Sequence, residues 1–154
     1  MTTLLDIRDL TVTFSGRRRQ KPVTAISSLS LSLEKGESLS IIGESGSGKT
    51  TLMRAILGHV QPSEGSLRLF GTDVTLASDD EMTALRRRCA LVSQDPYGSL
   101  PPTLTVLDAV LEPWLIVRGR DTRKEAEKRA RELLEELGLG DEDILSSRVR
   151  LSLS

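Results

Sequence analysis

A glycine-rich run at residues 43–50 contains the side chains of this sequence that are best suited to bind phosphate. The run reads Gly-Glu-Ser-Gly-Ser-Gly-Lys-Thr. Gly46 and Gly48 permit backbone angles that other residues avoid, so successive N–H groups can converge on phosphate oxygens. Lys49 supplies a positive charge for the outer phosphates, and the Thr50 hydroxyl is suited to bind Mg²⁺. The pattern predicts a site for a nucleoside triphosphate with magnesium.

The elements on either side of this run have the order that a phosphate-binding loop requires. Residues 38–42 form a short apolar stretch that is typical of a strand in a parallel sheet, and the stretch ends at Gly43. Helical spacing begins after the glycines, with Leu52 and Ile56 on one side. A second strand of the same parallel sheet is expected at residues 89–93.

Alternation of apolar and polar residues predicts antiparallel strands before the loop. Leu5 and Ile7 form one such stretch, residues 10–14 form another, and residues 28–33 alternate between serine and leucine. After the loop, residues 67–70 show a similar pattern. These strands are expected to form a half-buried antiparallel sheet.

Helical spacing dominates the second half of the sequence. Three pairs have the spacing of a capping box: Ser78 with Glu81, Thr105 with Asp108, and Thr122 with Glu125. Between residues 126 and 137, alanines and leucines recur on one helical face and charged residues on the other. This half is therefore expected to be α-helical.

Composition excludes several classes of protein. The 154 residues are 38% apolar and 28% charged, which is typical of a globular protein rather than a disordered chain. The net charge of −1 gives no general attraction to nucleic acid, and no apolar run has the length of a membrane-spanning helix. Cys89 is the single cysteine, and a small buried thiol is expected there. We expect a cytoplasmic protein with no direct membrane insertion.

Two segments together carry a resemblance to a known family. Residues 43–52, followed by Ser-Gln-Asp-Pro-Tyr-Gly-Ser-Leu at residues 93–100, resemble the nucleotide-binding subunits of ABC importers, in particular those of the dipeptide, oligopeptide and nickel branch. The resemblance implies that Gln94 is the Q-loop glutamine, which contacts Mg²⁺ or the attacking water. It implies that Phe14 stacks on adenine, although an ordinary core role for Phe14 is equally open. The residues implied to hold ATP are Gly43, Glu44, Ser45, Gly46, Ser47, Gly48, Lys49, Thr50 and Thr51.

The resemblance also implies an architecture and partners. The implied fold is an α/β P-loop NTPase of ABC type, with an N-terminal antiparallel β subdomain, part of a parallel-sheet core and part of a helical subdomain. Residues 1–154 would form an incomplete ATP-binding domain, with the β subdomain and P-loop core at about 1–100 and the helical part at about 101–154. In the family, such a subunit works with a second ATPase subunit and transmembrane permease subunits at the inner face of the plasma membrane.

Several motifs of the family are not found in this sequence. The Leu-Ser-Gly-Gly-Gln signature, the catalytic glutamate and the switch histidine are missing. Either Leu151-Ser152 begins an altered signature or Leu153-Ser154 begins an interrupted one, so a truncated product is expected. The sequence thus predicts the ATP-binding portion of a transporter ATPase that binds nucleotide without hydrolysing it alone. Two alternatives remain: a non-catalytic nucleotide-binding fragment, or a non-transport P-loop or ABC protein.

Overall fold

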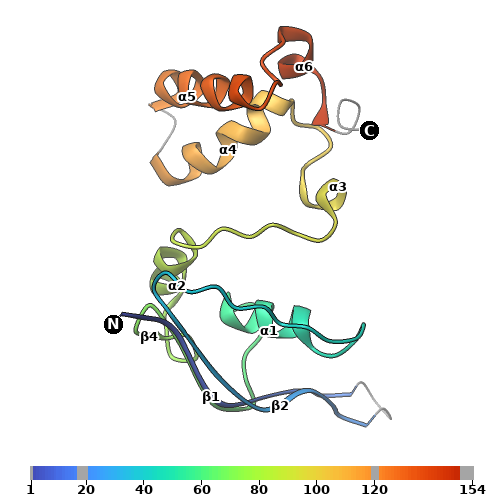
Figure 1. Ribbon diagram of the computed structural model, residues 1–154, viewed down its shortest axis with the longest axis vertical. Helices are drawn as coiled ribbons and strands as arrows, with labels where there is room; N and C mark the ends of the chain where they lie inside the picture. The colour runs from blue at the N-terminus through green and yellow to red at the C-terminus, as the bar shows by residue number, and fades with distance from the viewer. Residues whose placement is uncertain (1, 17–20, 119–121, 150–154) are drawn as a thin grey trace. The chain divides into compact units, whose positions relative to one another are not determined.

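The computed structural model describes residues 2–16, 21–118 and 122–149 (Figure 1). Within it the chain divides into two compact units, Met1–Ala90 and Leu91–Ser154. The first unit contains a β-sheet and two helices, and the second is helical. Within the described ranges, no helix has the length and apolar content needed to cross a membrane.

A four-stranded antiparallel sheet forms the base of the first unit. Its strands are β1 (Thr3–Phe14), β2 (Val23–Glu34), β3 (Glu64–Leu69) and β4 (Thr72–Asp73), in the order β2-β1-β3-β4. The expected antiparallel strands are confirmed, but residues 5–7 and 10–14 belong to one strand. A register shift between Ile7 and Leu10 interrupts the pairing of β1 with β2, and Asp9 there has a positive φ of 49°. This irregularity explains why the alternation in the sequence is broken at that point.

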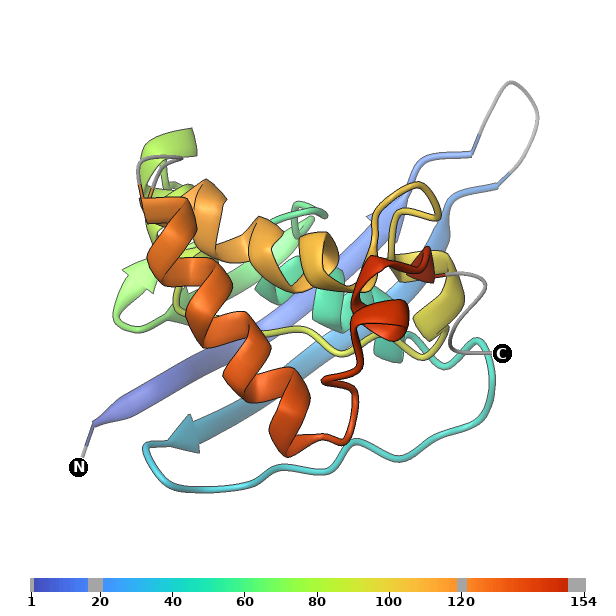
Figure 2. The same cartoon turned by 90° about the horizontal axis from the view of Figure 1, so that it is seen from above.

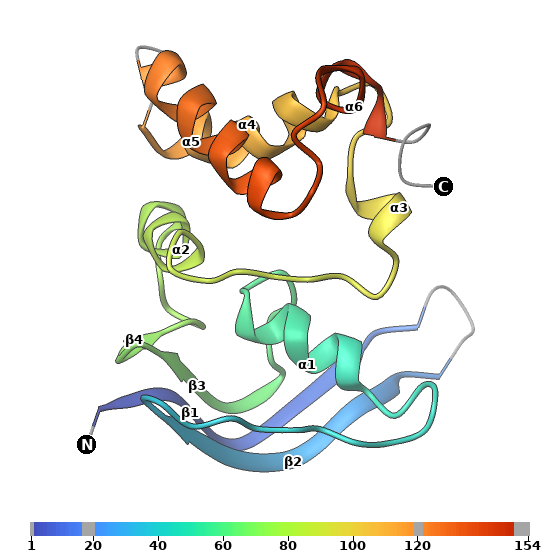
Figure 3. The ribbon, with the colours of Figure 1, turned by 45° about the horizontal axis from the view of Figure 1, so that its top comes forward.

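Two helices pack with this sheet through a shared apolar core. They are α1 (Lys49–Ile56) and α2 (Asp79–Arg86), and Figure 3 shows α1 lying across one face of the sheet. Leu52 and Ala55 of α1 are buried against the inward side chains of the strands, and Met82 and Leu85 of α2 join the same cluster. The helical spacing after the glycines therefore produced the expected helix, with its apolar side in the core.

The second unit is built around two neighbouring helices. Its helices are α3 (Pro96–Ser99), α4 (Val106–Arg118), α5 (Arg123–Glu136) and α6 (Glu142–Ser146). Leu111 of α4 is buried with Ala126 and Ala130 of α5. A second cluster joins Val106 to residues of α5 and α6. The helical character expected for this half is confirmed.

Two of the three expected capping residues accept a capping hydrogen bond in the structure, and the third does not. At Ser78 the side chain accepts a hydrogen bond from the Glu81 N–H, and the Glu81 carboxylate accepts one from the Ser78 N–H. The Thr105 hydroxyl also accepts from the Asp108 N–H, at 3.1 Å. Thr122 makes no side-chain capping bond, because its backbone (φ −93°, ψ 10°) is not in the extended conformation that directs a capping hydroxyl at the helix.

The two segments expected to form parallel strands are not strands in the described part of the chain. Residues 38–42 and 89–93 have no regular secondary structure. Figures 2 and 3 show the first segment leaving the end of β2 and running back along this strand towards α1. A strand requires a hydrogen-bonding neighbour, and the described residues provide none for either segment. An apolar sequence alone was therefore insufficient to produce a sheet.

Candidate functional site

The glycine-rich loop leads directly into the first turn of α1. Gly48 is the N-cap residue, with φ 93° and ψ 0°, and no side chain caps the helix. The first turn also contains no acidic residue. Because the first N–H groups of a helix have no partner within the helix, this end presents donors and a partial positive charge to an anion.

The Lys49 side chain folds back over the loop. Its ammonium nitrogen Nζ donates to the carbonyl oxygens of Gly43 at 2.7 Å and Glu44 at 2.6 Å, and to Ser47 Oγ at 3.2 Å. The Ser47 N–H donates to the Glu44 carbonyl at 3.3 Å, which closes a turn inside the loop. The full charge of Lys49 is thus held over the same loop as the free N–H groups of α1.

Strand β2 packs closely against the end of the loop at Gly48. A β-carbon on Gly48 would lie 2.4 Å from the carbonyl oxygen of Ala25 and 3.4 Å from Ile26 Cγ1. Only a residue without a side chain can approach the strand so closely. Sequence reasoning missed Ala25 and Ile26, because their spacing in β2 indicates only a strand and the contact depends on tertiary packing.

A cavity of about 300 Å³ lies between β2, the loop and α1. The polar part of its lining is Ser27, Gly43, Ser47, Gly48 and Lys49, and the apolar part is Ala25, Ile26, Leu29, Ile41, Ile42 and Leu52. The sequence predicted the loop and Lys49 as site residues, and the structure brings them together beside this cavity. The remaining members of the predicted set lie in the same loop or in the first turn of α1, where Ser45 and Thr50 are exposed and Thr51 is half-buried.

Thr50 offers the chemistry that a magnesium ion requires. Its hydroxyl lies in the first turn of α1, and no described residue is recorded as its side-chain hydrogen-bond partner. Mg²⁺ prefers oxygen ligands, retains several waters, and is commonly held by one or two protein oxygens together with phosphate oxygens. A single exposed hydroxyl beside a phosphate-binding loop fits that requirement.

The structure does not test the roles expected for Phe14 and Gln94. Phe14 is 44% exposed at the end of β1, opposite Val23 of β2, and it does not belong to the lining of the cavity beside Lys49. Gln94 is exposed in the segment before α3 and belongs to the second unit. Both roles stay predictions.

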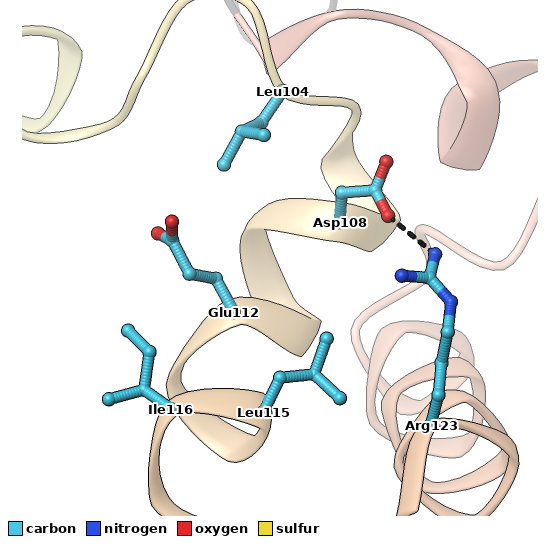
Figure 4. A pocket seen from close by; sticks show the side chains of 6 residues that line it. All are labelled: Leu104, Asp108, Glu112, Leu115, Ile116 and Arg123. Carbon is cyan, nitrogen blue, oxygen red and sulfur yellow. Dashed lines mark hydrogen bonds and ion pairs between the residues drawn. The ribbon is translucent and has the colours of Figure 1, made fainter. Parts of the chain in front are cut away.

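A larger cavity in the second unit has the wrong charge for a triphosphate. Its volume is about 640 Å³, and its lining includes Asp108, Glu112 and Arg123 (Figure 4). Arg123 pairs with Asp108 at 3.0 Å, so Glu112 leaves the lining with excess negative charge. Carboxylates of this kind repel phosphate, and the loop at Lys49 is therefore the better candidate for the nucleotide.

Comparison with known sequences relates this chain to transporter proteins. A family model described as "ABC transporter" matches residues 26–154. The chain is 36% identical over 146 residues to the di/tripeptide transport ATP-binding protein DppF of Pseudomonas aeruginosa, covering 92% of this chain and 45% of the relative. It is 42% identical over 123 residues to the oligopeptide transport ATP-binding protein OppD of Mycobacterium bovis, covering 80% of this chain and 20% of the relative. The chain thus spans less than half the length of both curated relatives.

Comparison with solved structures identifies the fold of an ATP-binding cassette. The ATP-binding cassette MJ0796, in a dimeric post-hydrolysis state bound to ADP and Pi, superposes with a TM-score of 0.78 at 29% identity. That match covers 97% of this chain and 63% of the cassette. The α/β P-loop NTPase fold of ABC type is therefore confirmed. Since the family model accounts for all but the first 25 residues, this chain belongs to the ABC transporter family.

Proposed function

We propose that this chain binds ATP with Mg²⁺ through residues 43–51. The observation that carries the proposal is the position of Lys49, whose Nζ lies within 2.7 Å of two loop carbonyls above the uncapped start of α1. A triphosphate entering here would meet a lysine charge, a helix N-terminus and free backbone donors together. When bound, Mg²⁺ would neutralise phosphate charge, and Thr50 would be the protein oxygen in this unit that holds it.

Replacing Lys49 by alanine tests this assignment. Calorimetric titration should show ATP affinity falling by about tenfold or more, because a charge-assisted hydrogen bond contributes about 1.5–3 kcal/mol. Lys35→Ala is the matched control, since Lys35 is an exposed lysine in the turn after β2. Equal ATP affinity in the parent and the Lys49→Ala variant would contradict the proposal.

We propose that, as part of a complete transporter, this cassette powers the uptake of peptides or a related solute. The support is its similarity to DppF and OppD, whose names describe peptide transport. The implied partners are transmembrane permease subunits and a second ATPase subunit, and the implied location is the cytoplasmic face of the membrane. Gln94 would contact Mg²⁺ or the attacking water there, and Phe14 would stack on adenine.

We further propose that these 154 residues do not hydrolyse ATP by themselves. The family's signature motif and catalytic glutamate are not found in the sequence, so a bound nucleotide would have no general base and no opposing signature. Phosphate release from Mg-ATP should equal the background of the Lys49→Ala variant. Release above that background would overturn this part of the proposal.

A further inference from the structure

The larger cavity, in the second unit, has the size of a small-molecule site. Its volume is about 640 Å³, and sites for small molecules commonly measure about 300–1,000 Å³. Its described lining residues come from the segment before α4, from α4 itself and from the start of α5 (Figure 4). Sites of this kind combine apolar walls with a few polar groups that select the ligand. The side chains of the lining therefore indicate which ligand would fit.

Three aliphatic side chains form the apolar wall of the cavity. They are Leu104, Leu115 and Ile116. Leu104 and Leu115 are half-buried, whereas Ile116 is 69% exposed, although removal of such a side chain from water is favourable. A hydrocarbon group in the cavity would cover this surface. The wall thus favours a ligand with an apolar body.

The polar part of the lining has one carboxylate more than it has positive charges. Arg123 forms an ion pair of 3.0 Å with Asp108, and the Thr105 hydroxyl donates to the other oxygen of that carboxylate. Glu112 lies one helical turn further along α4, and Figure 4 shows its carboxylate pointing away from Arg123. Within the described ranges no ion pair is recorded for Glu112. Because like charges four positions apart on a helix repel each other, a cation at Glu112 would be favourable.

The single arginine of α4 is engaged on an aromatic ring. The Arg118 guanidinium lies over the Trp114 ring, 5.0 Å from the ring centroid. We propose that the cavity binds a small organic cation, with its ammonium or guanidinium group at Glu112 and its apolar body on the aliphatic wall. An alkyl guanidinium or alkyl ammonium ion has this chemistry. The proposal does not depend on nucleotide binding, because the described lining lies outside residues 43–51.

Methyl NMR on the full 154-residue chain tests the proposal, with n-butylguanidinium as the probe and without nucleotide. The probe should shift the methyl signals of Leu104, Leu115 and Ile116 to saturation, with a dissociation constant in the millimolar range, because an ion pair that remains in contact with water is weak. Two related compounds, n-butanol without the charge and methylguanidinium without the apolar body, should each bind at least about threefold more weakly.

Two glutamine variants separate Glu112 from the general charge of the chain. Glu112→Gln keeps the shape of the side chain and removes its charge, so it should weaken n-butylguanidinium binding by about threefold. Glu136→Gln, at an exposed glutamate of α5 outside the described lining, should leave the affinity unchanged. Circular dichroism should show equal secondary structure in both variants and the parent, because both glutamates are exposed.

A variant of the wall tests the apolar contact. Ile116→Ala should weaken the binding of n-butylguanidinium by about twofold or more and leave that of methylguanidinium unchanged, because only the butyl chain reaches the wall. Equal weakening of both compounds would contradict the proposed orientation of the ligand.

Four further results would overturn the proposal: no saturable shifts, equal affinity for n-butanol, equal weakening by the two glutamine variants, or much tighter binding of the blocked peptide Leu-Arg-Leu than of n-butylguanidinium. The last result would assign the cavity to a partner protein instead. These titrations contain no nucleotide, whereas the Lys49→Ala titration measures ATP. Failure of one assignment is therefore distinguishable from failure of the other.

Discussion

The carbonyl oxygen of Ala25 occupies the space that a side chain on Gly48 would require. A β-carbon at Gly48 would lie 2.4 Å from this oxygen, which is closer than any ordinary contact. Gly48 also has a φ of 93°, a conformation that side chains disfavour. Strand β2 and the start of α1 are therefore held together at a point where no other residue fits.

Two glycine variants separate the contact with Ala25 from backbone strain. Gly48→Ala should lose ATP binding and lower the free energy of unfolding by more than the strain of about 1–2 kcal/mol, because β2 must also move. Gly46 has a φ of 83° but open space around it, so Gly46→Ala should show the strain alone. Chemical denaturation and ATP titration would measure both. A smaller loss of stability for Gly48→Ala than for Gly46→Ala would contradict the described packing.

Arg86 should stabilise the C-terminal end of α1. Its guanidinium donates to the carbonyl oxygens of Leu57 at 2.9 Å and Gly58 at 3.4 Å, where the helix leaves carbonyls without partners. Arg86→Ala should lower the free energy of unfolding by about 1 kcal/mol. Arg87→Ala, at an exposed neighbour, should change it by less than about 0.5 kcal/mol. Equal effects of the two variants in urea denaturation would argue against this role.

The turn after β4 should weaken in acid. Hydrogen bonds from Thr75, chiefly from its hydroxyl, hold the pKa of Asp73 below its ordinary value of 3.8. A lowered carboxyl pKa contributes stability above that value, and the contribution is lost as pH falls through the folded-state pKa. Thr75→Val should therefore cost about 1 kcal/mol at neutral pH and less near pH 2. Thr83→Val, on the exposed side of α2, is the control, and a pH-independent cost for Thr75→Val would contradict the prediction.

The Cys89 thiol should react slowly in the folded chain. Burial raises its pKa, while the nearby Arg88 charge lowers it to a smaller extent. Since the thiolate is the reactive form, alkylation by iodoacetamide at neutral pH should be slower than for a free cysteine, and it should accelerate when denaturant exposes the thiol. Mass spectrometry over time would follow the reaction. Equal rates in the folded and denatured chain would show that the thiol is not protected.

Features that depend on neighbouring residues were predictable from the sequence. The capping box at Ser78 joins residues three positions apart, so its spacing is readable directly. At Thr122 the same spacing was present without the capping bond, because the backbone of Thr122 itself is not extended. The role of the glycine-rich loop in binding ATP, the roles of Gln94 and Phe14, and a domain boundary near residue 100 stay predictions.

The sequence by itself determined the phosphate-binding pattern, the alternating strands of the antiparallel sheet and the helix that begins at Lys49, because each depends on local spacing and backbone preference. Only the tertiary structure decided what supports the loop and whether the apolar segments become strands. The contact of Gly48 with Ala25 joins residues 23 positions apart in the printed sequence, and no local pattern marks it. Residues 38–42 have no strand partner among the described residues, and no local sequence pattern could show this, because a strand depends on a hydrogen-bonding neighbour.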